Sequence, residues 1–244
     1  MSIYIMIGIL LIANLFLCSS DKRITWSGQQ WIVKSGDNIG PGPNSWSSDN
    51  VFVDSDGNLH LQITYNRFNG EWECAALYTV NKISFGTYQW WIDSSLEFDK
   101  NVVLGLFTYG QTDRQNEIDI EFSKWGDANR ATNANYNVYP SDKQYSNTPS
   151  FWNIDVLGGG GTYTTQRFKW NSRSIEFWAI AGHYNIGREV NVLNNWKFAP
   201  SDYTNLIPQT SNMKLHMNLW LFRGNAPSNN RPVEVVIRGF QSDN

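Results

Sequence analysis

Residues 116–122, Asn-Glu-Ile-Asp-Ile-Glu-Phe, alternate acidic and apolar side chains with a period of two. This is the side-chain period of a β-strand, so we expect Glu117, Asp119 and Glu121 to share one face. A helix would also bring Glu117 and Glu121 together, at positions i and i+4, but it would put Asp119 and the two isoleucines on the wrong faces. The stretch therefore predicts a strand with an acidic face and an apolar face.

Three carboxylates on one strand face repel one another. Their closeness costs stability unless they share protons or act on a substrate. A solvated strand face is the structural alternative, and such a string also arises by chance in ordinary sequences. We interpret Glu117, Asp119 and Glu121 as catalytic candidates because the neighbouring sequence supplies the other parts of a site.

The rest of the chain consists of short runs of β-branched and aromatic residues separated by Gly, Asn, Asp and Pro. No stretch after residue 20 has helical periodicity of useful length. Turns are expected at 56–57 and 158–161, and a loop at 41–44. The pattern predicts an all-β fold, a β-sandwich. Its strands are expected at residues 51–53, 59–65, 86–93, 102–109, 117–122, 134–139, 162–170, 174–181, 214–222 and 233–240.

Two of these strands carry polar and aromatic side chains at every second position. They are Asn135, Asn137 and Tyr139 on residues 134–139, and His216, Asn218, Trp220 and Phe222 on residues 214–222. Each set alone is compatible with the half-exposed face of an antiparallel sheet. Beside the acidic strand they predict a groove lined by amides and rings.

Composition favours a neutral glycan as the ligand. Aromatic residues make up 15% of the chain, and ring faces pack well on the C–H faces of sugars while Asn, Gln, Ser and Thr bind hydroxyls. The net charge is -3 with only 17% charged residues, which leaves no basic surface for nucleic acid. His60, His183 and His216 lack metal-ligand spacing, so we predict no metal and no cofactor.

The first 20 residues contain no Asp, Glu, Lys or Arg, and residues 3–17 are almost wholly apolar. A membrane-spanning helix needs roughly 20 apolar residues, and this run is shorter and is followed by small residues. We therefore predict a cleaved signal peptide over 1–20 and a secreted protein without stable membrane insertion. An uncleaved membrane anchor is the alternative, because Lys22 and Arg23 follow the run and no Lys or Arg precedes it.

Residues 21–244 are expected to form a single catalytic domain, since no repeat or linker interrupts them. Cys74 is the only cysteine in that range, so we predict no disulfide and a reduced, largely buried thiol. We expect the protein to be a monomer.

The acidic strand resembles the catalytic signature of glycoside hydrolase family 16. Other segments resemble strands of the same family and keep its order, from about Trp26 to Phe240. They are Gly86-Thr87-Tyr88, Leu106-Phe107-Thr108-Tyr109, Phe168-Lys169-Trp170 and Met217-Asn218-Leu219-Trp220. The resemblance implies a concanavalin A-like jelly roll with a concave substrate groove.

Residue by residue, Glu117 matches the family's nucleophile, Asp119 its assisting carboxylate and Glu121 its general acid/base. The resemblance thus implies a retaining, endo-acting enzyme that cleaves a β-linked glucan or a related polysaccharide by double displacement. The residues expected to bind this substrate are Phe107, Tyr109, Asn135, Asn137, Asn218 and Trp220.

A single residue separates Asp119 from Glu121, so the sequence resembles the family's unbulged group, which includes licheninases and xyloglucan-active enzymes. It has Ala76 where licheninases carry a sugar-binding Glu, and Gln166 where a His is common. Two other functions use the same fold. A wall-glycan transglycosylase would share the acidic trio, whereas a lectin-like binding module would have no need of three crowded carboxylates.

Overall fold

The computed structural model describes residues 21–110, 115–154, 162–210 and 212–243. The predicted signal peptide, residues 1–20, and the predicted turn at 158–161 lie outside the described residues. Within the described ranges, no helix has the length and apolar character needed to cross a membrane.

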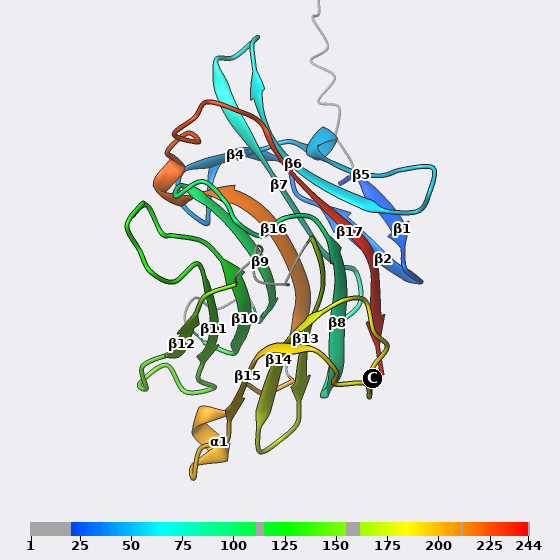
Figure 1. Cartoon of the computed structure of the whole chain (residues 1–244), viewed down its shortest axis with the longest axis vertical. Coiled ribbons are helices and arrows are strands. Elements are labelled where there is room, and N and C mark those ends of the chain that lie inside the picture. The colour runs from blue at the N-terminus through cyan, green and yellow to red at the C-terminus, as the bar shows by residue number, and fades with distance from the viewer. Residues whose placement is uncertain (1–20, 111–114, 155–161, 211, 244) are drawn as a thin grey trace, which may run out of the picture.

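The strands form one continuous, mostly antiparallel hydrogen-bonded sheet of 17 strands that folds into two layers, called here the inner and the outer sheet (Figure 1). The inner sheet has the order β1-β2-β7-β16-β9-β10-β11-β12. Its strands are β1 (Arg23–Trp26), β2 (Gln29–Val33), β7 (Glu71–Thr79), β16 (Lys214–Leu221), β9 (Val102–Tyr109), β10 (Glu117–Phe122), β11 (Ala134–Tyr139) and β12 (Thr148–Trp152). The acidic strand β10 therefore lies inside the sheet, paired on both sides.

The outer sheet has the order β5-β6-β17-β8-β13-β14-β15. Its strands are β5 (Val51–Val53), β6 (Leu59–Asn66), β17 (Val233–Ser242), β8 (Gly86–Asp93), β13 (Tyr163–Trp170), β14 (Ile175–Ala181) and β15 (Val192–Phe198). The hairpin of β6 and β7 links this sheet to the inner one and projects at the top of Figure 1.

Short elements complete the chain. β3 (Gly36–Ile39) pairs with β4 (Asn44–Trp46), and β4 runs parallel to β7. The helical turns are η1 (Ser48–Asn50), α1 (Tyr203–Leu206) and η3 (Phe222–Gly224).

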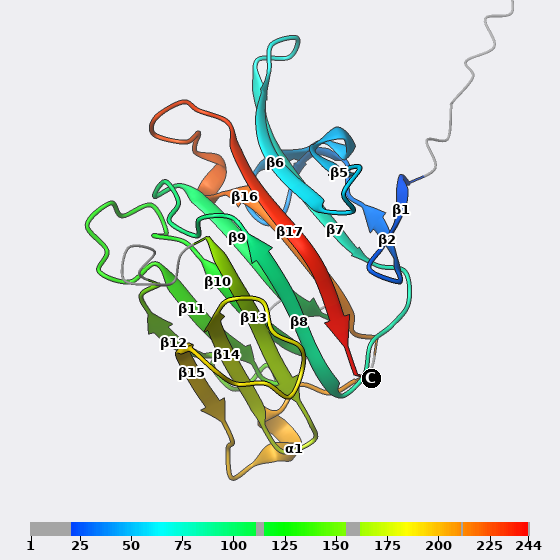
Figure 2. The ribbon, with the colours of Figure 1, turned by 45° about the vertical axis from the view of Figure 1, so that its right-hand side comes forward.

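The core lies between the two sheets, which Figure 2 shows as layers. From β10, Ile118, Ile120 and Phe122 are fully buried, as the alternation predicts. The Tyr136 ring of the inner sheet stacks on Phe177 of the outer sheet with 4.7 Å between ring centroids. Such contacts bury apolar faces of both layers, which drives the sandwich together. The all-β jelly-roll prediction is confirmed.

Every predicted strand range contains a strand, with ends shifted by at most two residues. Phe222 is a correction, because β16 ends at Leu221 and Phe222 begins η3, where Arg223 takes a positive φ of 56°. The predicted loop at 41–44 ends one residue early, since β4 begins at Asn44.

Some strands have sequences that do not predict them. The central strand β7 contains Cys74-Ala75-Ala76, which has low strand propensity. The edge strand β12 contains Pro149, which an edge tolerates. The edge strand β15 is largely exposed and contains two asparagines. The short strands β1 to β4 were likewise not predicted.

Candidate active site

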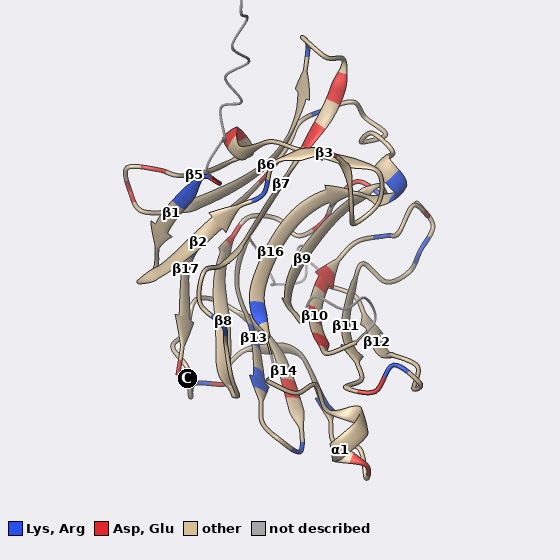
Figure 3. Ribbon diagram, turned by 180° about the vertical axis from the view of Figure 1, so that it is seen from behind, with Lys and Arg blue, Asp and Glu red and all other residues tan. Residues whose placement is uncertain are grey.

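The three carboxylates lie on one face of β10, at the centre of the inner sheet. Glu117 and Glu121 are partly exposed, whereas Asp119 between them is 3% exposed. Seen from behind, β10 carries red acidic segments on a ribbon that is mostly uncharged around it (Figure 3). Pairing with β9 and β11 fixes the register, with Asp119 opposite Phe107 on one side and Asn137 on the other.

Asp119 holds a proton more strongly than an ordinary aspartate. Burial raises its pKa well above the usual value, and the negative charges of Glu117 and Glu121 raise it further. A hydrogen bond to Glu117 acts in the same direction, while the Asn137 amide opposes it. Protonated Asp119 can donate a hydrogen bond to the Glu117 carboxyl group and hold it in place.

Glu121 is suited to exchange a proton near neutral pH. Burial raises its pKa to about 7, and a hydrogen bond from Asn135 opposes the shift. In that bond Asn135 Nδ2 donates to Glu121 Oε2 over 3.0 Å. A carboxyl group with a pKa near the working pH can act as an acid in one step and as a base in the next.

A groove of about 740 Å³ opens beside the trio. Its lining contains both aromatic rings and hydrogen-bonding groups. The lining residues are Lys34, Gly40, Pro41, Gly42, Trp46, Ala76, Tyr78, Phe107, Tyr109, Glu117, Tyr139, His216, Met217 and Asn218. Three of the predicted substrate-binding residues, Phe107, Tyr109 and Asn218, are among them.

The other three predicted substrate-binding residues have different surroundings. Asn135 and Asn137 are buried and hydrogen-bonded to the acids. Trp220 is 8% exposed, and its ring packs edge-on against Trp125 with centroids 6.2 Å apart. Trp220 lies two positions after the groove residue Asn218 on β16, so both side chains are on the same face of the strand. Other side chains cover most of the Trp220 ring.

Asn218 presents an acceptor without a partner. Its Oδ1 is buried and makes no hydrogen bond within the part of the chain that the structure describes. The side chain leans over Gly105, where an added Cβ would come within 2.5 Å of Oδ1. Gly105 is the register partner of both Glu121 and Asn218, and its missing side chain lets the Asn218 carboxamide lie over β9.

A row of stacked rings forms the groove wall. His216 stacks between Phe107 and Tyr78, with centroid distances of 5.0 and 5.2 Å. Burial lowers the pKa of His216 to about 3, and the charges of Lys214 and Lys34 lower it further. His216 is therefore neutral under ordinary conditions and acts as a flat aromatic surface.

Some groove residues had no predicted role. His216 and Asn218 lie two positions apart, and this spacing in the sequence predicted that both would face the groove. Lys34, whose Nζ lies 4.1 Å from the centre of the Trp46 ring, has no such signal. It is brought to the groove by β2 and β4, which sequence patterns did not predict.

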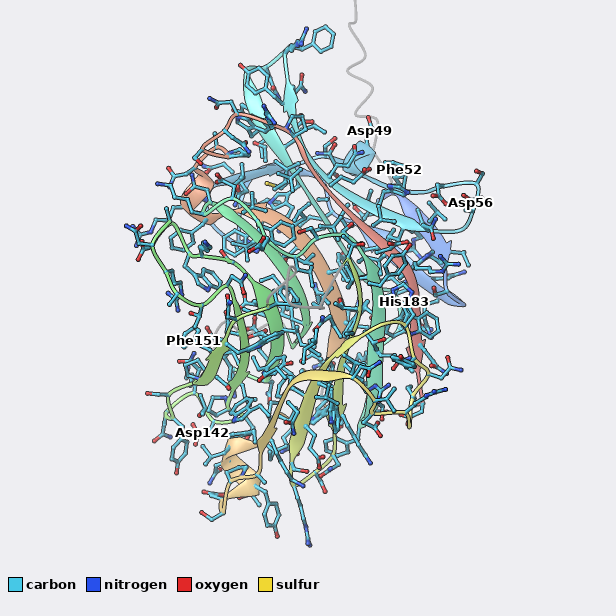
Figure 4. The ribbon with its side chains drawn as sticks, viewed as in Figure 1. Asp49, Phe52, Asp56, Asp142, Phe151 and His183 are labelled. Carbon is cyan, nitrogen blue, oxygen red and sulfur yellow. The ribbon has the colours of Figure 1, made fainter. Side chains whose placement is uncertain are left out.

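The remaining histidines have structural contacts. His60 lies between Asp54 and Glu234, at 3.0 and 2.9 Å, and His183, labelled in Figure 4, meets the Ile92 carbonyl at 2.9 Å. Among the described residues, no group of three or more His, Cys, Asp and Glu side chains is arranged to hold a metal ion.

Phe151, also labelled in Figure 4, projects from β12 with half its surface exposed, and the Arg130 guanidinium lies 4.6 Å from the centre of its ring.

Solved structures with this fold include β-glucanases. A Bacillus licheniformis β-glucanase is 24% identical over 87% of this chain and 90% of its own, with a TM-score of 0.63. A prokaryotic β-1,3-1,4-glucanase (lichenase) from a mouse hindgut metagenome is 20% identical over 90% and 95%, with a TM-score of 0.63. A Bacteroides ovatus mixed-linkage-glucan GH16 protein in complex with the product G4G4G3G is 13% identical over 87% and 94%, with a TM-score of 0.62.

No curated protein sequence matches the chain significantly. The family model described as Glycosyl hydrolases family 16 matches residues 43–235, which include every strand of the groove except β2. With the acidic trio on the inner sheet and the fold shared with β-glucanases, this match shows that the chain belongs to glycosyl hydrolase family 16 and is a glycosidase that hydrolyses O-glycosyl bonds.

Proposed function

We propose that the protein is an endo-acting, retaining β-glucanase in which Glu117 is the nucleophile, Asp119 its assisting acid and Glu121 the general acid/base. The observation that carries the proposal is the arrangement of the trio on one face of β10. Asp119 is buried and hydrogen-bonded to Glu117, whereas Glu121 accepts from Asn135 and has a pKa raised by burial to about 7. The buried Asp119 can therefore hold Glu117 in place, while Glu121 can give up a proton.

In the first step the Glu117 carboxylate attacks the anomeric carbon, and the bond from that carbon to the glycosidic oxygen breaks. The Glu121 proton passes to the departing oxygen. Asp119 steadies the nucleophile by its hydrogen bond and reduces the repulsion within the trio.

In the second step Glu121, now ionised, takes a proton from water. The resulting hydroxide equivalent attacks the same carbon, displaces Glu117 and leaves the sugar with its original anomeric configuration. The pKa of about 7 suits Glu121 to both roles, because neither protonation state is strongly favoured near neutral pH.

The groove supports a neutral glucan as substrate. The rings of Phe107, His216 and Tyr78 offer a flat wall for sugar faces. Asn218 Oδ1, which has no partner within the described ranges, can accept a hydrogen bond from a sugar hydroxyl. The names of the structural neighbours, a lichenase and a mixed-linkage-glucan protein, point to β-1,3-1,4-glucan as the first substrate to test.

The deciding experiment incubates residues 21–244 with mixed-linkage β-glucan, laminarin, xyloglucan and agar, and measures product sizes over time. We expect early release of short oligosaccharides from one β-glucan, with the β-anomer formed first in the NMR spectrum. Products longer than the starting chains would instead identify a transglycosylase. No cleavage and no transfer on any polymer would contradict the proposed substrate class.

A polymeric glucan is too large to enter a cell intact. We therefore also propose that the protein acts outside the cell, which agrees with the export signal predicted from the apolar run at 3–17. Mass spectrometry of the secreted protein, with an N-terminus close to residue 21, is the expected finding. Retention of the whole protein in the membrane fraction would favour the anchor.

A further inference from the structure

Two asparagines on β11 face two of the acids. Asn135 lies opposite Glu121 in the strand register, and Asn137 lies opposite Asp119. Both amides are buried, and each makes a hydrogen bond to the acid across from it. The orientation of each amide decides whether its acid faces a donating –NH₂ group or an accepting carbonyl oxygen.

A second group approaches the oxygen of each amide from the side away from the acid. Trp125 Nε1 donates to Asn135 Oδ1 over 3.2 Å, and Asn147 Nδ2 donates to Asn137 Oδ1 over 3.0 Å. The two differ in chemistry. The Asn147 amide could turn over and accept, whereas the indole N–H of Trp125 can only donate.

Because Trp125 can only donate, Asn135 must turn its oxygen toward the indole. Its –NH₂ group is then directed at Glu121 Oε2, as observed. With that oxygen engaged, Oε1 is the atom left to carry the proton. The direction of the hydrogen bond to Glu121 is thus set by Trp125, acting through the Asn135 amide.

The backbone of Trp125 is strained, and the packing around it holds the ring in one position. Its φ is 53°, which is unusual for a bulky side chain, and Gly126 follows with φ 82°. The Ser123 hydroxyl accepts from the Trp125 amide over 2.9 Å. The ring is held edge-on by Phe222 and Trp220, with centroids 5.6 and 6.2 Å away. Strained residues fixed by their surroundings are concentrated at functional sites.

We propose that Trp125 is a positioning residue for the glycosidase: its donor-only N–H fixes the Asn135 amide so that Glu121 always meets a donor on Oε2. The proposal rests on the proposed role of Glu121 as general acid/base. Without the indole N–H, the amide can turn its oxygen to Glu121, and an acceptor at that position favours the protonated carboxyl group.

The proton affinity of Glu121 also depends on its other neighbours. Glu117 and Asp119 face it from its own strand, Tyr139 from β11 and the neutral His216 from β16, while β9 contributes Tyr109 as its titratable side chain on this face. Trp125→Phe leaves all of these in place. The change in titration is therefore attributable to the Asn135 amide.

The test compares Trp125→Phe with the wild type on mixed-linkage β-glucan across pH. We expect the basic limb of kcat/KM to move up by about 0.5 pH unit or more, because protonated Glu121 persists to higher pH. Phe222→Leu is the control: it removes ring packing from Trp125 but no hydrogen bond, so it should lower the melting temperature without moving the limb.

The Asn135→Leu variant then separates an effect of Trp125 that passes through the Asn135 amide from a direct effect of the indole on Glu121. In that background there is no amide to orient, so adding Trp125→Phe should cause no further shift. An equal shift in both backgrounds, or none in either, would overturn the proposal.

A second measurement does not need activity. The Glu121 carboxyl carbon, followed by NMR in ¹³C-labelled protein, should titrate at higher pH in Trp125→Phe than in the wild type. If the wild type cleaves no glycan, the proposed substrate class fails, but this titration still decides the role of Trp125. An unchanged titration midpoint would refute it.

Discussion

Two buried polar clusters, one in each sheet, differ in how completely their hydrogen bonds are formed. In the outer sheet, Arg167 is 1% exposed and each of its three guanidinium nitrogens has a partner. Nε donates to Gln89 Oε1 over 2.8 Å, Nη1 to Glu189 Oε1 over 2.5 Å, and Nη2 to the Asn185 carbonyl over 2.9 Å. The acid cluster of the inner sheet combines three carboxyl groups, and among the described residues the nearby Asn218 Oδ1 has no hydrogen-bond partner.

The contrast teaches that burial alone does not indicate a function. A buried charge with an opposite charge and filled hydrogen bonds holds its surroundings in place, and it gains nothing from a ligand. A cluster with raised pKa values and an unfilled acceptor is stable only at a cost to the fold, and a substrate can use the proton and the acceptor. The following tests address that difference.

The largest effect is expected for the proposed nucleophile. Glu117→Gln keeps the shape of the side chain but removes the carboxylate proposed to attack, so turnover should fall by more than about 10³-fold. The melting temperature should stay close to that of the wild type. Glu189→Gln, a matched change in the arginine cluster, should keep its activity. A near-normal rate in Glu117→Gln would contradict the assigned role.

The arginine cluster should show the reverse pattern. Arg167→Met leaves Gln89 Oε1 buried without its donor, while Glu189 stays solvated, and should cost about 1 to 3 kcal/mol of unfolding free energy. The fraction that folds should hydrolyse glucan at the wild-type rate. Urea denaturation and kcat/KM of the purified protein measure both quantities, and a stability loss below about 1 kcal/mol would show that the network is dispensable.

Stability should also depend on pH through Glu121. Its folded pKa of about 7 lies above the ordinary value of 4.5, so its favourable contribution is present below pH 4.5 and is lost as the pH rises through 7. Between pH 4.5 and 8 the wild type should lose on the order of 1 to 3 kcal/mol more than Glu121→Gln. Parallel stability curves for the two proteins would show that Glu121 is not destabilised by burial.

Cys74 provides a neutral buried group against which both clusters can be compared. Its thiol is fully buried, lies 3.5 Å from Asn44 Oδ1, and has a pKa raised by burial to about 12. A thiol reagent should therefore label the native protein at least about 100-fold more slowly than the denatured protein. Rapid labelling at neutral pH would show that the region around Cys74 opens in solution.

The fold was largely predictable because its strands repeat a simple physical pattern. The alternation at 117–122 predicted both faces of β10, and Ile118, Ile120 and Phe122 are buried accordingly. Cys74 is buried as well, as expected for a cysteine with no partner. Strand β7 was absent from the predicted strand ranges because Cys74-Ala75-Ala76 has low strand propensity, whereas the pairing of β7 with β2 and β16 is a tertiary contact.

The site was only partly predictable for the same reason. Periodicity identified the trio and the neighbouring faces of β11 and β16, but it could not show that Asn135 is bonded to Glu121 or that Trp220 is mostly covered. Trp125 lies in a turn with a positive φ, and its bond to Asn135 joins residues that no strand period relates. Lys34 and Trp46 meet only because separate strands converge on the groove.

The pairing of β10 on both sides has a consequence for how the protein is made. Its residues are held opposite β9 and β11 at every position from Ile118 to Phe122. If the strand slipped by one residue, three carboxylates would enter the apolar core and the isoleucines would face solvent. A chain with this slipped register would not fold, so it would not persist as a weakly active enzyme. The strand pairing that the chain needs to fold is therefore the same pairing that places the three carboxylates together. We expect few inactive molecules among those that fold.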